Sequence, residues 1–303
     1  MESVPEIAAL PDVRRALLRW HRAHGLHAPW RESGNPYETL VAAVMAQQTQ
    51  MSRVMPAYER FIAAFPTVEA LAGASPGAVI RAWSGMGYNA RAVRLHRAAR
   101  TIAATGWPRD AASLARIDGI GPFTAAVIAS FAFGQRAACV DTNVRRVLGR
   151  LAGDETLDGA RLQQLADRSL AVRAPARWNQ ALMDYGARVC TPRPDCGGCA
   201  VARWCASRER YMAPRSSLGE KRGVYRAGPR KPAYAGSPRW YRGRIIEVLR
   251  ALPPGGSVPV RSLPRRIERD GRVLAPAETW ALVAALERAG LVVLHRGRVA
   301  LPE

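Results

Sequence analysis

Leu114-Ala115-Arg116-Ile117-Asp118-Gly119-Ile120-Gly121-Pro122-Phe123-Thr124-Ala125-Ala126-Val127 is the stretch that decides the fold. Its pattern predicts a short helix, a Gly-x-Gly hairpin and a second helix opened by Pro122, a residue favoured at the first helical position. The glycines permit positive φ and leave no side chain between the backbone and an approaching group. Free N–H groups at the N-terminus of the second helix suit a phosphate. A Gly-x-Gly pair alone fits an ordinary turn equally well.

An acidic residue follows twenty positions after Gly121. Asp141 lies in Val140-Asp141-Thr142-Asn143-Val144-Arg145-Arg146-Val147, at the head of a basic helix. Taken alone, Asp141 is best interpreted as the N-cap of that helix.

Four of the five cysteines form a cluster with the spacing Cys190-x5-Cys196-x2-Cys199-x5-Cys205. In a cytosolic chain such a cluster favours a metal centre over a disulfide framework. Structural zinc usually uses two Cys-x2-Cys pairs, or cysteine with histidine, whereas only one close pair is present here. The pattern therefore favours a cubane [4Fe-4S] cluster, with zinc and free thiols as the alternatives. The separate Cys139 lies in an apolar run and is expected to be an inert core residue.

Composition points to a polyanionic partner. The 303 residues carry a formal charge of +21, almost all of it from arginine, although codon bias is an alternative reason for that excess. Such a charge attracts nucleic acid. No long uncharged apolar stretch predicts a membrane span, and the acidic N-terminus does not resemble a secretion signal, so a cytoplasmic location is expected.

Helical periodicity dominates residues 7–212, and no segment there alternates as a strand does. The predicted helices are 12–24, 36–47, 52–64, 77–84, 89–104, 122–133, 142–151, 160–171 and 176–188. Residues 213–237 are basic and rich in Gly and Pro, which predicts a linker that either follows a phosphate backbone or is simply solvated.

The tail, residues 238–303, is predicted to be a small domain of its own. Its patterning predicts helices at Tyr241–Leu252 and Glu278–Ala289, and a further helix beginning within Val258–Ile267. Apolar runs at 291–294 and 298–301 then predict a hairpin. This order indicates a winged-helix-like α+β domain, used either for DNA binding or for packing and protein contact.

The hairpin, Asp141 and the cysteine loop together resemble the helix–hairpin–helix DNA glycosylases, and among these the MutY-like, A/G-specific adenine glycosylases, over about residues 12–210. The supporting segments are Ala28–Arg31, Gln47–Gln50, Gly85–Ala92 and Asn179–Gly186. The resemblance implies an all-α fold of two lobes with DNA and a flipped base between them. One lobe would span 30–134 and contain the hairpin; the other would combine 1–29 with 135–212 and carry the cluster.

The resemblance also implies residue roles. Asp141 would stabilise positive charge on the sugar as the base departs, and Asn143 would orient it. Gln48 would fill the gap in the base stack and Tyr88 would wedge beside the mispair, since extruding a base costs a few kcal/mol. Without the resemblance, these two would be interpreted as a helix-surface residue and a turn-packing aromatic. Further DNA contacts are expected from Gln47, Trp30, Arg31, Gly119, Gly121 and Arg145.

Two residue types are missing from places where relatives use them. Some relatives cleave the strand through a Schiff-base lysine one residue after the position of Pro122, where this chain has Phe123, and residues 1–220 contain no lysine. The chain is therefore expected to be monofunctional, without an efficient AP lyase step. The adenine-removing relatives also carry a glutamate that protonates the departing base, at the position of Ala43. Glu38 lies five residues earlier, roughly 140° around the helix, and cannot simply replace it.

Three functions remain open from the sequence. The first is a base-excision glycosylase for adenine opposite 8-oxoguanine or guanine. The second is a monofunctional glycosylase for uracil, thymine opposite guanine, or hypoxanthine, whose departure does not need that acid. The third is a lesion-binding protein without turnover. Each implies double-stranded DNA with a mispaired or damaged base as the partner, no membrane, and a monomer associated with the nucleoid.

Overall fold

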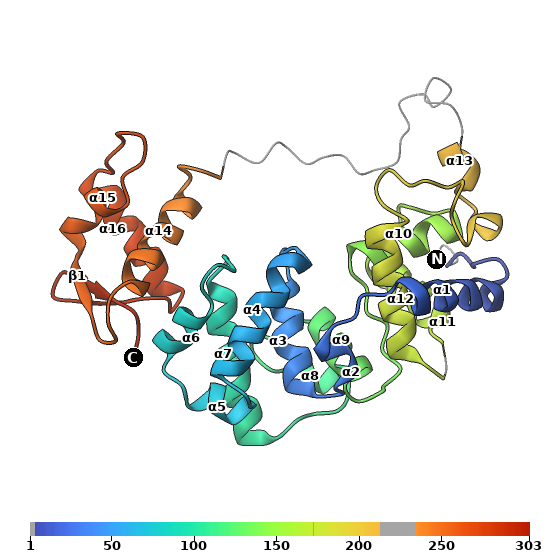
Figure 1. Ribbon diagram of the computed structural model, residues 1–303, viewed down its shortest axis with the longest axis horizontal. Helices are drawn as coiled ribbons and strands as arrows, with labels where there is room; N and C mark the ends of the chain where they lie inside the picture. Colours follow the sequence, from blue (N-terminus) through green and yellow to red (C-terminus); the bar gives the residue numbers. More distant parts are fainter. Residues whose placement is uncertain (1–3, 172, 213–233) are drawn as a thin grey trace. The chain divides into compact units, whose positions relative to one another are not determined.

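The computed structural model describes residues 4–171, 173–212 and 234–303, and it divides into two compact units (Figure 1). Among the described residues, the first unit contains 4–39, 108–115, 121–171 and 173–212; the second contains 40–107, 116–120 and 234–303. The second unit thus joins the tail to residues 40–107. The lobes predicted at 30–134 and at 1–29 with 135–212 remain predictions.

Helices are the regular secondary structure assigned in the described residues of the first unit. They are α1 (Leu10–His24), α2 (Pro29–Glu32), the start of α3 (Pro36–Ala46), α8 (Ala111–Leu114), α9 (Pro122–Phe131), α10 (Thr142–Ala152), α11 (Gly159–Ser169), α12 (Pro175–Arg188), η1 (Ala202–Trp204) and α13 (Arg208–Met212). Helix α12 packs against both α1 and α10. The core between them buries Leu17, Leu148, Trp178 and Tyr185 almost completely, which stabilises the unit by removing large apolar surfaces from water.

The second unit combines helices with the tail. Its helices are the remainder of α3, then α4 (Met51–Ala64), α5 (Val68–Gly73), α6 (Pro76–Ala82) and α7 (Ala90–Thr105). The tail adds α14 (Pro238–Arg250), β1 (Ser257–Pro259), η2 (Val260–Ser262), α15 (Leu263–Arg266), α16 (Pro276–Arg288), β2 (Val293–His295) and β3 (Arg298–Ala300). The strands form an antiparallel sheet in the order β1-β3-β2, with Val258 opposite Val299 and Leu294 opposite the same residue. This arrangement agrees with the predicted winged-helix-like domain.

Helix positions follow the predicted ones closely, and the differences have local causes. The short helices α2, α5 and α13 were not predicted, because four to six residues give too little periodicity to recognise. The short helix predicted before the hairpin is present as α8, which ends at Leu114. In the tail, Ser257–Pro259 forms a strand where a helix was predicted to begin, and the helical turns start only at Val260. Most of the predicted linker 213–237 lies outside the described residues. Within the described part of the chain, no helix is long and apolar enough to cross a membrane.

Candidate functional site

Asp141 caps helix α10 and is half-buried. Its Oδ1 accepts hydrogen bonds from the backbone N–H groups of Asn143 (2.9 Å) and Val144 (2.7 Å), and its Oδ2 accepts one from Asn143 Nδ2 at 3.0 Å. The N-cap interpretation is therefore confirmed, and Asn143 contacts the carboxylate that it is predicted to orient. Burial raises the pKa of Asp141 above its usual range, although these N–H donors and Arg146 oppose the shift.

A chain of hydrogen bonds links this carboxylate to the cysteine loop. Asn143, which donates to Asp141, accepts at its Oδ1 from Arg146 Nη2 at 2.8 Å. Arg146 Nε in turn donates to the carbonyl oxygen of Cys190 at 2.6 Å. Glycine at position 186 allows this close packing, because a Cβ there would lie 2.7 Å from that of Asn143. The orientation of Asp141 therefore depends on the position of Cys190.

A buried asparagine fixes the segment that leads to Asp141. Asn179 Oδ1 accepts from the backbone N–H of Cys139 at 3.1 Å, and its Nδ2 donates to the carbonyl of Ala137 and to Ser130 Oγ, both at 2.9 Å. Cys139 is completely buried, as expected for an inert core residue. Asn179 thereby joins helices α9 and α12 to the backbone two residues before the carboxylate.

Cys190, Cys196, Cys199 and Cys205 line one hollow at the end of α12 and are free thiols. Tyr185 supports this loop, since its hydroxyl lies 3.1 Å from Cys199 Sγ and accepts from the backbone N–H of Ala200. Among the described residues, no three Cys, His, Asp or Glu side chains lie close enough together to hold one metal ion.

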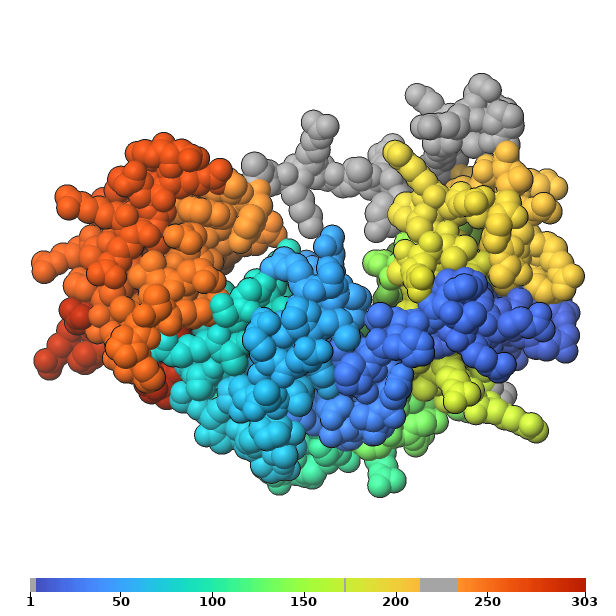
Figure 2. Space-filling view, viewed as in Figure 1, coloured from blue at the N-terminus to red at the C-terminus, as the bar shows by residue number. Residues whose placement is uncertain are grey.

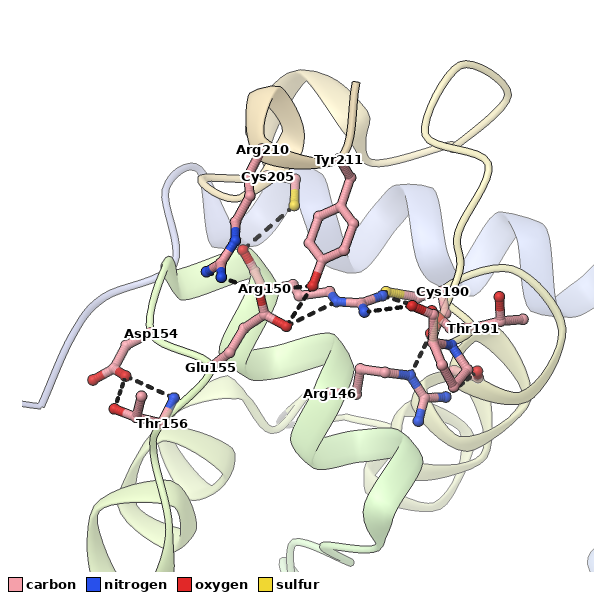
Figure 3. A network of polar contacts seen from close by, with 12 residues as sticks. Arg146, Arg150, Asp154, Glu155, Thr156, Cys190, Thr191, Cys205, Arg210 and Tyr211 are labelled. Atoms are coloured by element: carbon pink, nitrogen blue, oxygen red, sulfur yellow. Dashed lines mark hydrogen bonds and ion pairs between the residues drawn. The ribbon is translucent and has the colours of Figure 1, made fainter. Parts of the chain in front are cut away.

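Arg150 ties the hollow to α10, as Figure 3 shows. The side chain is buried beside Glu155 (3.2 Å), and its Nη1 donates to the carbonyl of Thr191 at 2.7 Å and to Cys190 Sγ at 3.4 Å. Its guanidinium also lies 4.2 Å from the centre of the Tyr211 ring. A positive charge held in this way offsets negative charge on thiolate sulfurs.

In the second unit, Gln48 and Tyr88 share an unusual backbone conformation. Both are exposed, and both have positive φ, 54° and 44° respectively. Non-glycine residues enter this region at a cost, and such outliers gather at functional sites. The structure thus presents the two predicted DNA-penetrating residues at the tips of tight turns.

One buried arginine holds both turns. Arg91 is 3% exposed. Its Nη1 donates to the carbonyls of Val44, Met45 and Gln47, while its Nη2 donates to the carbonyl of Met86 and to Thr49 Oγ1. Burial lowers the pKa of Arg91 to about 10, so it remains charged at neutral pH. We infer that Arg91 is a positioning residue for Gln48 and Tyr88.

Arg91→Met should lower the free energy of unfolding by about 2–4 kcal/mol, because buried carbonyls lose their donor. It should also weaken binding to a mispair duplex more than binding to a fully paired one, since both turns loosen. Urea unfolding and fluorescence anisotropy measure the two effects. Arg100→Met is the matched control, as Arg100 is exposed on the same helix. Equal behaviour of the two variants would contradict this role.

Trp30 and Arg31 have structural partners. Trp30 is buried, and Arg31 forms a two-pronged ion pair with Asp184, with Nη1–Oδ2 and Nη2–Oδ1 distances of 2.8 and 2.9 Å. Burial alone would raise the pKa of Asp184, but hydrogen bonds from His21 and Arg31 hold it well below its usual range. DNA contact by Trp30 and Arg31 therefore stays a prediction that this geometry does not favour.

The two hairpin glycines differ in whether the fold itself requires a glycine at that position. Gly119 has φ 93°, and a Cβ there would lie 2.5 Å from the carbonyl oxygen of Arg94, so its backbone demands glycine. Gly121 caps α9 at an ordinary φ of −78°, with nothing within 4 Å of an added Cβ. This open space suits the predicted approach of a phosphate. Arg145 is exposed one turn along α10 and is available for such a contact.

Comparison with known proteins agrees with this geometry. Residues 41–169 match the profile of the HhH-GPD superfamily base excision DNA repair proteins. An adenine DNA glycosylase of Mycobacterium tuberculosis is 39% identical over 245 residues, which cover 78% of this chain and 77% of that protein. The chain belongs to the adenine DNA glycosylase family. The human adenine DNA glycosylase is 36% identical over 223 residues, 68% of this chain and 41% of that protein.

Solved structures extend the family likeness to the fold. A thermostable thymine-DNA glycosylase superposes with a TM-score of 0.63 at 26% identity, covering 66% of this chain and 97% of that one. An endonuclease III trapped as a covalent intermediate with DNA gives a TM-score of 0.57 at 22% identity, covering 68% and 99%. The predicted helix–hairpin–helix glycosylase fold is confirmed.

The sequence alone indicates no role for Arg91, Arg146 or Asn179. Arg91 and Asn179 lie inside the segments Gly85–Ala92 and Asn179–Gly186 that carried the resemblance, yet nothing in the sequence shows that they are buried. Arg146 was noted only as one of several basic residues on α10. Their contacts join residues distant along the chain, so only the fold identifies them.

Proposed function

We propose that this adenine DNA glycosylase family member hydrolyses the N-glycosidic bond of adenine mispaired with 8-oxoguanine or guanine. The carboxylate of Asp141, held by three N–H donors at the head of α10, is the observation that carries the proposal. A fixed negative charge facing the sugar stabilises the positive charge that develops as the base leaves. Water then completes the hydrolysis.

Asp141 acts in its ionised form. Because burial raises its pKa, protonation begins at a higher pH than for an ordinary aspartate, and excision should be lost as pH falls through that window. Asn143 donates a hydrogen bond that orients the Asp141 carboxylate, and Arg146 holds Asn143 in place. Gly121 and Arg145 are the proposed contacts to phosphate. Gln48 and Tyr88 are the proposed fillers of the stack from which adenine is extruded.

The cysteine loop is proposed to hold a [4Fe-4S] cluster. All four thiols line one hollow, and Arg150 supplies a buried positive charge beside Cys190. These donors fit the group, because a cubane body needs thiolates spread around it, and cysteine is its preferred ligand. When bound, the cluster would fix the position of Cys190, and through Arg146 that of Asn143.

The protein is proposed to be monofunctional. Residues 1–220 contain no lysine, and position 123 is phenylalanine, so no side-chain amine can form a Schiff base in this region. Sodium borohydride should therefore trap no covalent complex with substrate DNA, and strands should break only after alkali. Phe123→Lys, which supplies an amine in the hairpin, is the comparison variant. A borohydride adduct with the unaltered protein would show that another amine takes part.

A panel of duplexes tests the proposed function. Purified protein is incubated under single-turnover conditions with A·8-oxoG, A·G, U·G, T·G and hypoxanthine·T duplexes, and abasic sites are then cleaved with alkali. Cleavage confined to the adenine duplexes is expected. Cleavage confined to uracil, thymine or hypoxanthine, or binding without product, would overturn the proposal.

A further inference from the structure

Reciprocal arginine contacts join the tail to α6 and to the N-cap residue of α7 within the second unit. Figures 1 and 2 show the tail in orange and red. Arg81 on α6 donates to the carbonyls of Arg250 (2.9 Å) and Leu252 (2.7 Å), which are free at the end of α14. Arg250 donates back to the carbonyl of Ile80 and to Asn89 Oδ1, each at 2.9 Å. Helix α14 is thereby fixed beside the turn that ends at Tyr88.

Close packing supports the same joint. Ile80 and Val93 belong to the apolar core of the tail. The backbone N–H of Gly77 donates to the carbonyl of Pro302, and a Cβ at Gly77 would lie 2.5 Å from that oxygen. Because core and backbone contacts both cross the joint, the tail packs directly on α6.

This joint places a tail residue on the Tyr88 ring. Arg239 in the first turn of α14 donates from Nη1 to the Tyr88 hydroxyl at 3.2 Å, and its guanidinium lies 5.6 Å from the ring centre. The same guanidinium lies 4.9 Å from the ring centre of Tyr234. The two tyrosines are 46% and 53% exposed. Within the described residues, no carboxylate forms an ion pair with Arg239.

We propose that the tail supplies Arg239 as a phosphate-binding residue at the mispair, acting beside Tyr88 as one DNA-contacting surface. The inference rests on the proposed function, which brings duplex DNA to Tyr88. An exposed guanidinium without a counter-ion recognises phosphate strongly, and aromatic faces next to it can stack on bases. The charge of the tail also favours contact with phosphate, because residues 238–303 contain twelve arginines and six acidic residues.

Salt dependence of binding tests the proposal. Anisotropy titrations with A·8-oxoG and fully paired duplexes are made between about 50 and 200 mM salt, a range over which phosphate contacts strongly change affinity. The full-length protein carries Asp141→Asn so that substrate persists. Arg239→Ala should weaken binding to both duplexes roughly threefold to tenfold. It should also lower the slope of log K against log salt by about 1, the loss of one phosphate contact. Arg239→Lys should keep that slope.

Arg244→Ala is the matched control, because Arg244 is an exposed arginine of the same helix, roughly 140° around from Arg239. It should leave both affinity and slope unchanged. An unchanged slope in Arg239→Ala would overturn the proposal, because Arg239 would then only support the Tyr88 ring. The outcome is independent of turnover: failure of the proposed function would appear as absence of product from the unaltered protein, whatever the slope shows.

Discussion

Asp141→Asn should abolish excision while leaving the protein folded. Removing the negative charge that is proposed to face the sugar should slow single-turnover base removal on the order of 10²–10⁴-fold. Asparagine caps helices as well as aspartate does, so its side-chain oxygen can still accept from the N–H groups of Asn143 and Val144. The change in the free energy of unfolding should stay within about 1 kcal/mol.

The stability measurement makes this test specific. Burial raises the pKa of Asp141, so ionising it costs the folded state stability as pH rises through that pKa. Asparagine does not ionise, so the Asp141→Asn variant does not carry this loss of stability. That gain offsets the loss of the hydrogen bond from Asn143 Nδ2. Asp12→Asn is the control and should excise normally, because Asp12 is a half-buried acidic residue in the first turn of α1, paired with Arg15. Full excision by Asp141→Asn would show that the catalytic carboxylate lies elsewhere.

Ala43→Glu should accelerate adenine excision about 10²-fold or more, because it supplies a general acid to the departing base. Ala43 is buried on α3, at the position where the family resemblance implies a proton-donating glutamate. Without that acid, the departing adenine must take its proton from solvent. A glutamate placed at 43 would have its pKa raised by burial among apolar neighbours, and would therefore hold a proton at neutral pH. Single-turnover rates on A·8-oxoG duplexes measure the gain.

The pH profile gives a second readout. In the unaltered protein, excision should quicken as pH falls, until protonation of Asp141 stops it; Ala43→Glu should flatten the rising part. Ala43→Gln is the control, because glutamine has the same size without an acidic proton. If glutamate and glutamine variants excise adenine equally slowly, another group of this chain already protonates the base.

Local signals predicted much of this fold correctly. The helix at α10 was recognisable from its cap and apolar spacing, and the hairpin from Gly119 and Pro122. The main helices and the hairpin within the tail were also predictable. The strand at Ser257–Pro259 was not, because three residues cannot display a period. The short helices α2 and α5 were not predicted for the same reason.

The candidate site was predictable only in part. The spacing of Asp141 and of the four cysteines indicates their roles in the sequence. Arg91 and Arg146 instead donate to backbone carbonyls more than forty positions away, which the sequence does not reveal. Arg31 shows what the sequence does not reveal: its guanidinium pairs with Asp184, 153 positions away, so its predicted DNA contact stays a prediction that this geometry does not favour. A sequence shows which residues are charged, whereas only packing shows which charges are left for DNA.

Release of free adenine tests the central claim most directly. Unaltered protein is mixed in excess with an A·8-oxoG duplex, and the liberated base is identified and quantified by chromatography and mass spectrometry against the abasic sites formed. The account predicts adenine in amounts equal to the abasic sites, and none with Asp141→Asn. Retention of all adenine in the DNA by iron-loaded, DNA-binding protein would contradict it.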